Sequence, residues 1–294
     1  MITTAVFVMD NMLELYNACK SGNIEAVKKI TINSDNINYK DNCGDTPLHV
    51  ACHNGHYEVV KLMISYGANL NETNHDGCTP LITSLERHYY NIAIMLIFNN
   101  ADVNKKDNFG YTPLHISCIK GFSATTKLLI SYGAIVNEKN DYGNTPLHIS
   151  CSKGHYELAA LLISHNADVN GKNNFGETPL HVACTNKCHG IVELLIENNA
   201  DINKKNNYGN TALHYTCLFG CYEMAKLLIH YGADIYSKDN NKETPLMIVQ
   251  KYEYNDIVNL LKKEVKKRIY VTSLIINIDV LKHYIVKKID YFIV

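Results

Sequence analysis

The chain has 294 residues, of which 46% are hydrophobic, so it is long enough to bury an extensive core. Its 28 basic and 29 acidic residues nearly cancel to a formal net charge of −1, which argues against nucleic acid or an anionic surface as the partner of the whole chain. The charge is nevertheless uneven, because residues 262–294 carry a net charge of +5 and leave −6 for the rest.

No stretch of the chain approaches 18 uncharged apolar residues, so we expect no transmembrane helix. The first ten residues, MITTAVFVMD, lack a cationic segment and a small-residue cleavage site, so we expect no signal peptide. Ten cysteines in a chain without an export signal favour a reducing compartment and free thiols over a disulfide framework. These features together predict a cytoplasmic protein.

Residues 1–37 contain a degenerate copy of a unit that recurs through most of the chain. In the stretch LELYNACKSGNIEAVKKI, Gly22 takes the place that Gly55 has in the first regular copy, and Cys19 takes the place of Cys52. We expect this segment to act as an N-terminal cap on the repeats that follow.

The regular copies share a four-residue motif that returns every 33 residues without an insertion. It reads TPLH in four copies and TPLI, TALH or TPLM in the others, and it starts at Thr46, Thr79, Thr112, Thr145, Thr178, Thr211 and Thr244. All six prolines lie in this motif, and the glycines follow the same period, except Gly171 and Gly190. Self-similarity at a fixed period indicates a repeat architecture.

The chemistry of each copy predicts two helices. The threonine of the motif is a good helix N-cap, and proline after it fills the first helical position, where no donor is lost. Apolar residues then follow at helical spacing; in residues 170–202 they include Leu180 and Ala183 in the first helix and Ile191 and Leu194 in the second. A glycine at the phase of Gly55 suits the turn between the helices, and the Asn/Asp-rich stretch before each motif predicts a hairpin turn. One such unit cannot bury its apolar face alone, so neighbouring units must stack.

The full motif, DxxGxTPLHxAxxxGxxxxxxLLIxxGADxN, resembles the ankyrin repeat over residues 38–268. The resemblance implies an all-α solenoid of helix–turn–helix repeats with short β-hairpin loops. It also implies a non-catalytic function in protein–protein interaction. Seven repeats follow the N-terminal cap, at residues 38–70, 71–103, 104–136, 137–169, 170–202, 203–235 and 236–268.

The stretch GETPLHVACTNKCHG at residues 176–190 places two histidines and two cysteines close together, as a metal site does. However, Cys184 belongs to a column that also holds Leu85, and a position that accepts either residue is a packing position. His181 belongs to a column in which Ile82 and Met247 also occur, so it is not a metal ligand. The resemblance implies that these histidines join neighbouring repeats by hydrogen bonds. A zinc site formed by the Cys184/Cys188 and Cys217/Cys221 pairs is the alternative, but stacked helices about 8–10 Å apart are too distant for zinc bonds of about 2.3 Å.

The sequence contains no motif for nucleotide binding or for metal-dependent catalysis. The sequence contains no GxGxxG, GxxxxGK[ST] or HExxH pattern, and most of its histidines lie at repeat positions. We therefore predict no catalytic residue, no cofactor and no bound metal.

The columns that vary between repeats indicate where a partner binds. The residue before the loop glycine is aromatic in four consecutive repeats, a lysine lies three residues before it, and Tyr111 follows one of these glycines. We predict a partner-binding ladder made of Lys106, Phe109, Tyr111, Lys139, Tyr142, Lys172, Phe175, Lys205 and Tyr208, because aromatic residues contribute most of the energy at interfaces. The alternative is that the aromatic rings pack on the next hairpin and the lysines form a solvated edge. Single-stranded nucleic acid also stacks on such rings, but the net charge of −6 disfavours it.

Residues 269–294 break the period and predict an amphipathic helix, with Leu274, Ile278, Leu281, Ile285 and Ile289 on one face. This helix is either a C-terminal cap, a docking segment or a membrane-surface helix. Some viral ankyrin proteins carry a C-terminal F-box-like module that recruits a ubiquitin ligase, but no such motif is recognisable here.

The sequence as a whole predicts a monomeric scaffold that binds a protein partner without a membrane span or nucleic acid. A substrate adaptor for a host ubiquitin ligase and a self-assembling scaffold are the alternatives. The composition, rich in Asn, Ile, Lys and Tyr and without Trp, resembles that of the ankyrin proteins of large DNA viruses of amoebae, although intracellular bacteria and protists have similar proteins. A viral origin implies a host protein in the host cytoplasm as the partner.

Overall fold

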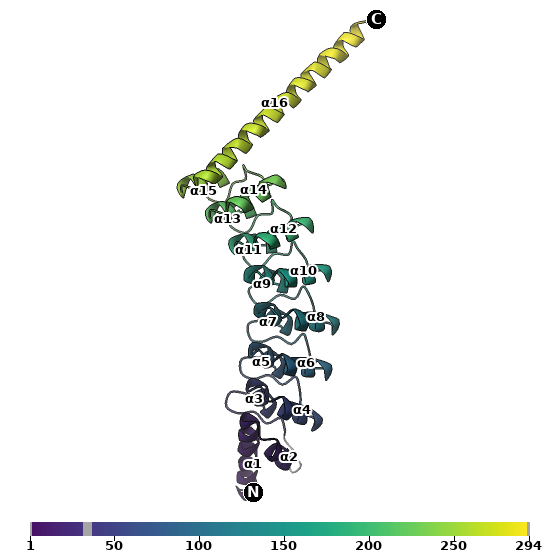
Figure 1. Ribbon diagram of the computed structural model, residues 1–294, viewed down its shortest axis with the longest axis vertical. Helices are drawn as coiled ribbons and strands as arrows, with labels where there is room; N and C mark the ends of the chain where they lie inside the picture. The colour runs from purple at the N-terminus through teal and green to yellow at the C-terminus, as the bar shows by residue number, and fades with distance from the viewer. Residues whose placement is uncertain (1, 32–36, 293–294) are drawn as a thin grey trace. The chain divides into compact units, whose positions relative to one another are not determined.

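The computed structural model describes the backbone of residues 2–31 and 37–292 and the side chains of residues 12–31 and 37–273. Over these residues every regular element is an α-helix, sixteen in all (Figure 1). The first eight are α1 (Ile2–Ser21), α2 (Ile24–Thr31), α3 (Pro47–His53), α4 (Tyr57–Ser65), α5 (Pro80–Glu86), α6 (Tyr90–Phe98), α7 (Pro113–Lys120) and α8 (Ser123–Ser131). The others are α9 (Pro146–Lys153), α10 (Tyr156–Ser164), α11 (Pro179–Thr185), α12 (His189–Glu197), α13 (Ala212–Leu218), α14 (Tyr222–His230), α15 (Pro245–Lys251) and α16 (Asn255–Phe292).

The chain divides into two compact units, Met1–Val182 and Ala183–Val294, and the division falls within α11. In the first unit the first helices of successive repeats, α3, α5, α7 and α9, stack in order, and the second helices α4, α6, α8 and α10 stack beside them (Figure 1). In the second unit α13 packs on α15, α12 on α14, and α16 on both α14 and α15. Each unit is a stack of helix pairs, which confirms the predicted all-α repeat architecture.

The core of each stack consists of residues that recur with the 33-residue period. Leu48 and its equivalents Leu81, Leu114 and Leu147 are completely buried in the first unit. The cysteine column is buried as well, from Cys19 in α1 to Cys217 in α13, and Leu85 takes the same buried position in α5. These cysteines therefore act as small apolar side chains, as the sequence predicts.

The recurring threonine of the motif caps its helix in the way the sequence predicts. The Thr46 hydroxyl accepts a hydrogen bond from the backbone N–H of His49. In turn, Nδ1 of the His49 ring accepts from the backbone N–H of Thr46 at 3.1 Å and from its hydroxyl at 2.8 Å. The same reciprocal arrangement recurs at Thr112 and Thr145. Two backbone donors at the start of each helix are thereby satisfied.

The other ring nitrogen of the motif histidine donates to the next repeat. Because Nδ1 accepts from the threonine, Nε2 carries the proton and points at a backbone carbonyl 29 residues further on. These bonds join His49 to Cys78 at 2.9 Å, His115 to Asn144 at 3.0 Å, His148 to Glu177 at 3.1 Å and His214 to Glu243 at 3.3 Å. They confirm the role that the ankyrin resemblance implies for this column.

The turn glycine between two helices makes room for a ring of the following repeat. Gly55 has a φ of +75°, and a Cβ there would lie 2.3 Å from the Tyr89 ring. The second regular repeat has His88 in place of this glycine, and His88 adopts the same left-handed conformation with a φ of 66°. A non-glycine residue in this region carries backbone strain of about 1–3 kcal/mol.

The β-hairpin loops that the resemblance implies are not present as strands in the described part of the chain. The loops are turns, and successive loops are joined by few backbone hydrogen bonds, such as the one from the Asn108 N–H to the Asp76 carbonyl at 2.9 Å. A ladder of paired residues, which defines a β-strand, therefore does not form.

The C-terminal segment is helical, as predicted, but it is not a separate helix. Residues 269–292 continue α16, which begins at Asn255 as the second helix of the last repeat. The apolar positions Leu274 to Ile289 lie outside the residues whose side chains are described. The suggested role as a cap remains a prediction.

We expect acid to destabilise the fold through the buried histidines. Burial lowers the pKa of both His115 and His148 to about 4, whereas the unfolded value is about 6.5. The unfolded chain therefore binds protons first, so stability is complete above pH 6.5 and is lost as the pH falls toward 4. At pH 5 each of the two histidines costs about 2 kcal/mol. Urea unfolding at pH 7.5 and pH 5 measures this loss, and equal free energies of unfolding at the two values would contradict it.

Candidate protein-binding surface

The loop before each repeat motif has a fixed conformation that one Asp or Asn side chain organises. The Asp107 Oδ1 accepts hydrogen bonds from the backbone N–H of Phe109 at 2.9 Å and of Tyr111 at 2.8 Å. Asn140 holds Tyr142 in the same way, and Asn173 holds Phe175. We call these loops, residues 107–111, 140–144 and 173–177, the hairpin tips.

The aromatic side chains of the hairpin tips extend into solvent. Phe109 is 59% exposed, Tyr142 48% and Phe175 47%. Such exposure is high for large apolar rings, and it weakens the alternative that the rings pack on the next hairpin.

Backbone hydrogen bonds hold neighbouring hairpin tips in register. The Asp141 N–H donates to the Phe109 carbonyl at 3.1 Å, and the Asn174 N–H donates to the Tyr142 carbonyl at 3.0 Å. The structure thus brings three of the predicted aromatic residues together in the first unit.

Tyr208, the fourth predicted aromatic, belongs to the second unit. It is 57% exposed, Asn206 holds its backbone N–H at 2.9 Å, and its carbonyl accepts from the Asn240 N–H at 3.0 Å. Its local conformation therefore matches that of the hairpin tips of the first unit.

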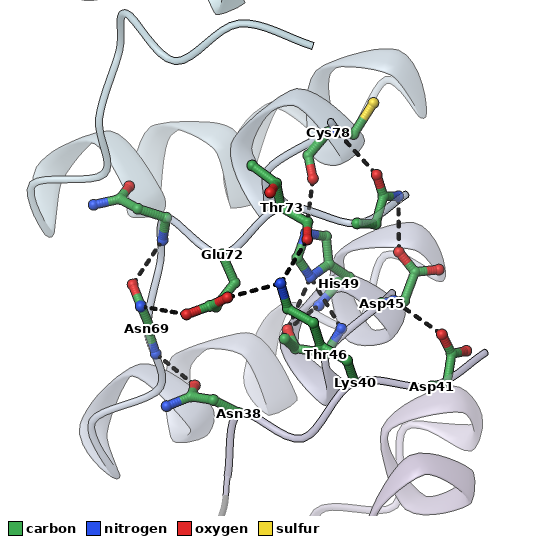
Figure 2. A network of polar contacts seen from close by, with 12 residues as sticks. Asn38, Lys40, Asp41, Asp45, Thr46, His49, Asn69, Glu72, Thr73 and Cys78 are labelled. Atoms are coloured by element: carbon green, nitrogen blue, oxygen red, sulfur yellow. Dashed lines mark hydrogen bonds and ion pairs between the residues drawn. The ribbon is translucent and has the colours of Figure 1, made fainter. Parts of the chain in front are cut away.

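The lysines three residues before the aromatic positions have a structural role that the sequence analysis missed. Figure 2 shows the first of these contacts: the Lys40 ammonium donates to the Thr73 carbonyl at 2.8 Å and pairs with Glu72 at 2.9 Å, beside the His49 bond to Cys78. In the same network the Asn69 N–H donates to the Asn38 side chain at 2.8 Å. Lysine, histidine and asparagine thus all join one repeat to the next.

The same carbonyl contact recurs at three of the predicted site lysines. Lys106 donates to the Lys139 carbonyl at 3.0 Å, Lys139 to the Lys172 carbonyl at 2.7 Å and Lys205 to the Lys238 carbonyl at 2.7 Å. Lys106 also pairs with Glu138 at 2.6 Å, and this lowers the pKa of the Glu138 carboxyl. Since these ammonium groups already bind within the chain, the lysines have a structural role beside the partner-binding role that the sequence predicts for them. The sequence does indicate this structural role, because a lysine that recurs in nearly every repeat is more typical of the scaffold than of a specific binding site.

Tyr111, which follows the loop glycine of its hairpin tip, is half-buried. Its ring meets that of His115 edge-on, with the centroids 5.9 Å apart, and burial raises the pKa of its hydroxyl. Two repeats earlier the equivalent residue, Asp45, accepts a hydrogen bond from the Asn74 amide at 2.9 Å. Tyrosine replaces that acceptor here, and the buried Asn140 Nδ2 has no hydrogen-bond partner within the described residues. This local departure from the repeat makes the site around Tyr111 different from its neighbours.

The hairpin tips are bordered by carboxylates that the repeat pattern does not reveal, those of Asp76, Glu86, Asp107 and Asp141. Burial raises the pKa of Glu86, and the charges of Asp107 and Asp76 add to this rise, whereas those of Lys120 and Arg87 oppose it. Burial likewise raises the pKa of Asp107, with Asp141 contributing. Among the described side chains no lysine or arginine lies within ion-pair distance of these four carboxylates.

Within the described side chains no three His, Cys, Asp or Glu residues are placed to hold a metal ion. In the suggested zinc cluster Cys184 is fully buried and Cys188 is partly exposed, and burial raises the pKa of both thiols. None of the helices in the described residues is long and apolar enough to cross a bilayer.

A scaffold of stacked helix pairs that presents exposed side chains on its loops is a repeat protein of the interaction class. The family profile described as ankyrin repeats (3 copies) matches residues 15–107, 95–173 and 167–239, so the chain belongs to the ankyrin repeat family. The match begins within the degenerate N-terminal copy. Proteins of this family are generally non-catalytic modules for protein–protein interaction. None of the curated proteins compared with the chain matches it.

We expect Lys139→Ala to lower the free energy of unfolding by about 1 kcal/mol, because the Lys172 carbonyl loses its charged donor. Lys105→Ala is the matched control, since Lys105 is an exposed lysine in the preceding repeat, next to Lys106, and we expect a change within about 0.5 kcal/mol. Urea unfolding of the two variants checks this difference. Equal stabilities would show that the lysine column is only a solvated edge.

Proposed function

We propose that the chain binds a partner protein through the hairpin tips of its first unit, with Phe109, Tyr142 and Phe175 as the main contacts. The observation that carries this proposal is the exposure of three consecutive aromatic rings, at 47–59%, above a backbone held by hydrogen bonds between repeats. The rings need little further ordering when a partner binds, so little conformational entropy is lost.

The spacing of the hairpin tips suits an extended segment of a partner. Stacked helices lie about 8–10 Å apart, so three rings span about 20 Å. Three residues of an extended chain span about 10 Å, so side chains at intervals of about three residues approach successive rings. Tyr111 adds a hydroxyl to this row, and this hydroxyl interacts with the side chain of Asn140.

The charge beside the rings favours a partner with basic side chains. Lys106 and Lys139 bind backbone carbonyls of the next repeat, and Lys106 also pairs with Glu138. Four carboxylates have no ion pair among the described residues, those of Asp76, Glu86, Asp107 and Asp141. A lysine or arginine of the partner gains both a carboxylate and an aromatic face at this place.

The proposal also covers the remaining predicted site residues, the oligomeric state and the location of the chain in the cell. Tyr208 is a contact for the same or another partner on the second unit, and Lys106, Lys139, Lys172 and Lys205 contribute only where their stems contact the partner. We propose that the chain acts as a monomer in the cytoplasm. A viral origin, suggested by the composition, would make the partner a host protein.

A substrate adaptor for a host ubiquitin ligase remains the second candidate. It requires the hairpin tips to hold the substrate and residues 269–294 to recruit the ligase. Co-purification of a ligase component that is lost when these residues are removed would support the adaptor function over a simple scaffold.

The decisive experiment captures partners from host cell lysate with the intact chain and with a variant carrying Phe109→Ser, Tyr142→Ser and Phe175→Ser. We expect the variant to lose the partner at least tenfold, because aromatic contacts at the centre of an interface each contribute about 2 kcal/mol or more. Adding Tyr208→Ser to the variant shows whether the second unit contributes.

The matched control carries Tyr57→Ser, Tyr66→Ser and Tyr156→Ser, three rings of similar exposure on the second helices or at their ends. Circular dichroism establishes that every variant folds. A partner that both the aromatic variant and the control retain would refute binding through the hairpin tips.

A further inference from the structure

The first turns of α16 are anchored to the second unit. Ile257, Val258 and Leu261 are buried where α16 packs on α14 and α15. The Arg268 guanidinium donates to the Ala233 carbonyl at 3.1 Å and to Glu264 at 3.0 Å. The helix is therefore held in place up to residue 268.

The opposite face of this anchored segment is basic and exposed. Lys262, Lys263, Lys266 and Lys267 are all exposed, and their spacing of i, i+1, i+4 and i+5 places them on one side of the helix. Lys267 has a long contact with Glu264 at 3.8 Å, and the other three have no ion pair among the described residues. Four positive charges thus face solvent within six residues.

Exposed apolar residues follow directly after these lysines. Ile269 is 62% exposed, Tyr270 65% and Val271 45%. Ile269 and Val271 also line an open groove of about 630 Å³, together with Tyr236, Lys267, Arg268 and Thr272. Helical spacing places Tyr270 on the same side of the helix as the four lysines, with Ile269 and Val271 to either side of it.

We propose that this basic and apolar face of α16 docks on the surface of a membrane that contains anionic phospholipids. Lysines beside apolar and tyrosine side chains match the two layers of such a surface, in which anionic headgroups lie above acyl chains. A second copy of the chain is a poorer occupant, because two-fold contact brings four like charges against four. The sequence that follows keeps apolar residues at helical spacing, from Leu274 to Ile289.

The experiment measures co-sedimentation of the full chain with vesicles of phosphatidylcholine alone and with vesicles of equal parts phosphatidylcholine and phosphatidylserine. We expect binding only to the anionic vesicles, with affinity falling as the salt concentration rises. A variant with Lys262→Gln, Lys263→Gln, Lys266→Gln and Lys267→Gln is expected to bind at least tenfold more weakly. A second variant, Ile269→Ser, Tyr270→Ser and Val271→Ser, is expected to lose at least tenfold as well.

The matched control removes four other exposed lysines of the second unit, with Lys226→Gln, Lys238→Gln, Lys242→Gln and Lys251→Gln, and we expect its binding to stay within twofold of the unchanged protein. Absent binding, equal binding to both vesicles, or undiminished binding by the first two variants would overturn the proposal. So would a concentration-dependent dimer that the apolar variant abolishes while vesicles capture nothing, which would assign the groove to a second copy.

Discussion

The hydrogen bond from a buried histidine to a backbone carbonyl of the next repeat is the contact on which the surface of this protein depends. Its acceptor is the residue directly after the loop glycine, so His115 holds the hairpin tip of Tyr142 and His148 holds that of Phe175. The same histidine caps its own helix through Nδ1, and one neutral ring thereby connects the helix, the repeat interface and the loop. Ile82 replaces it in the second regular repeat, so the Tyr111 carbonyl receives no such bond, and the Tyr111 ring lies against His115 instead.

The stacked helix pairs are predictable from the sequence because period, cap and turn chemistry all agree. Most repeats have the same residue type at the same position, as Thr46, Pro47 and Cys52 illustrate. These residues predict the 33-residue interval, the start of the first helix and the buried cysteine column. The exposure of Phe109, Tyr142 and Phe175 is consistent with the predicted ladder.

Other features depend on contacts that a linear sequence does not display. Nothing in the sequence distinguishes Lys106 and Lys139 from ordinary surface lysines, yet their ammonium groups bind carbonyls 33 residues away. Glu86 lies on a helix and not on a loop, so its approach to Asp107 emerges only when the repeats stack. The loops lack strand pairing because each joins its neighbour by isolated bonds. The hairpin tips are therefore bordered by carboxylates as well as by the lysines that the sequence predicts beside the rings.

The two proposed surfaces are chemically distinct: aromatic and acidic on the hairpin tips of the first unit, basic and apolar on α16 in the second. Hydrogen–deuterium exchange of the intact chain, with and without its captured partner, tests the central proposal most directly. We expect slower exchange of the backbone amides in residues 107–111, 140–144 and 173–177 when the partner is bound. Unchanged exchange at these hairpin tips, with slowing confined to the second helices or to α16, would contradict it.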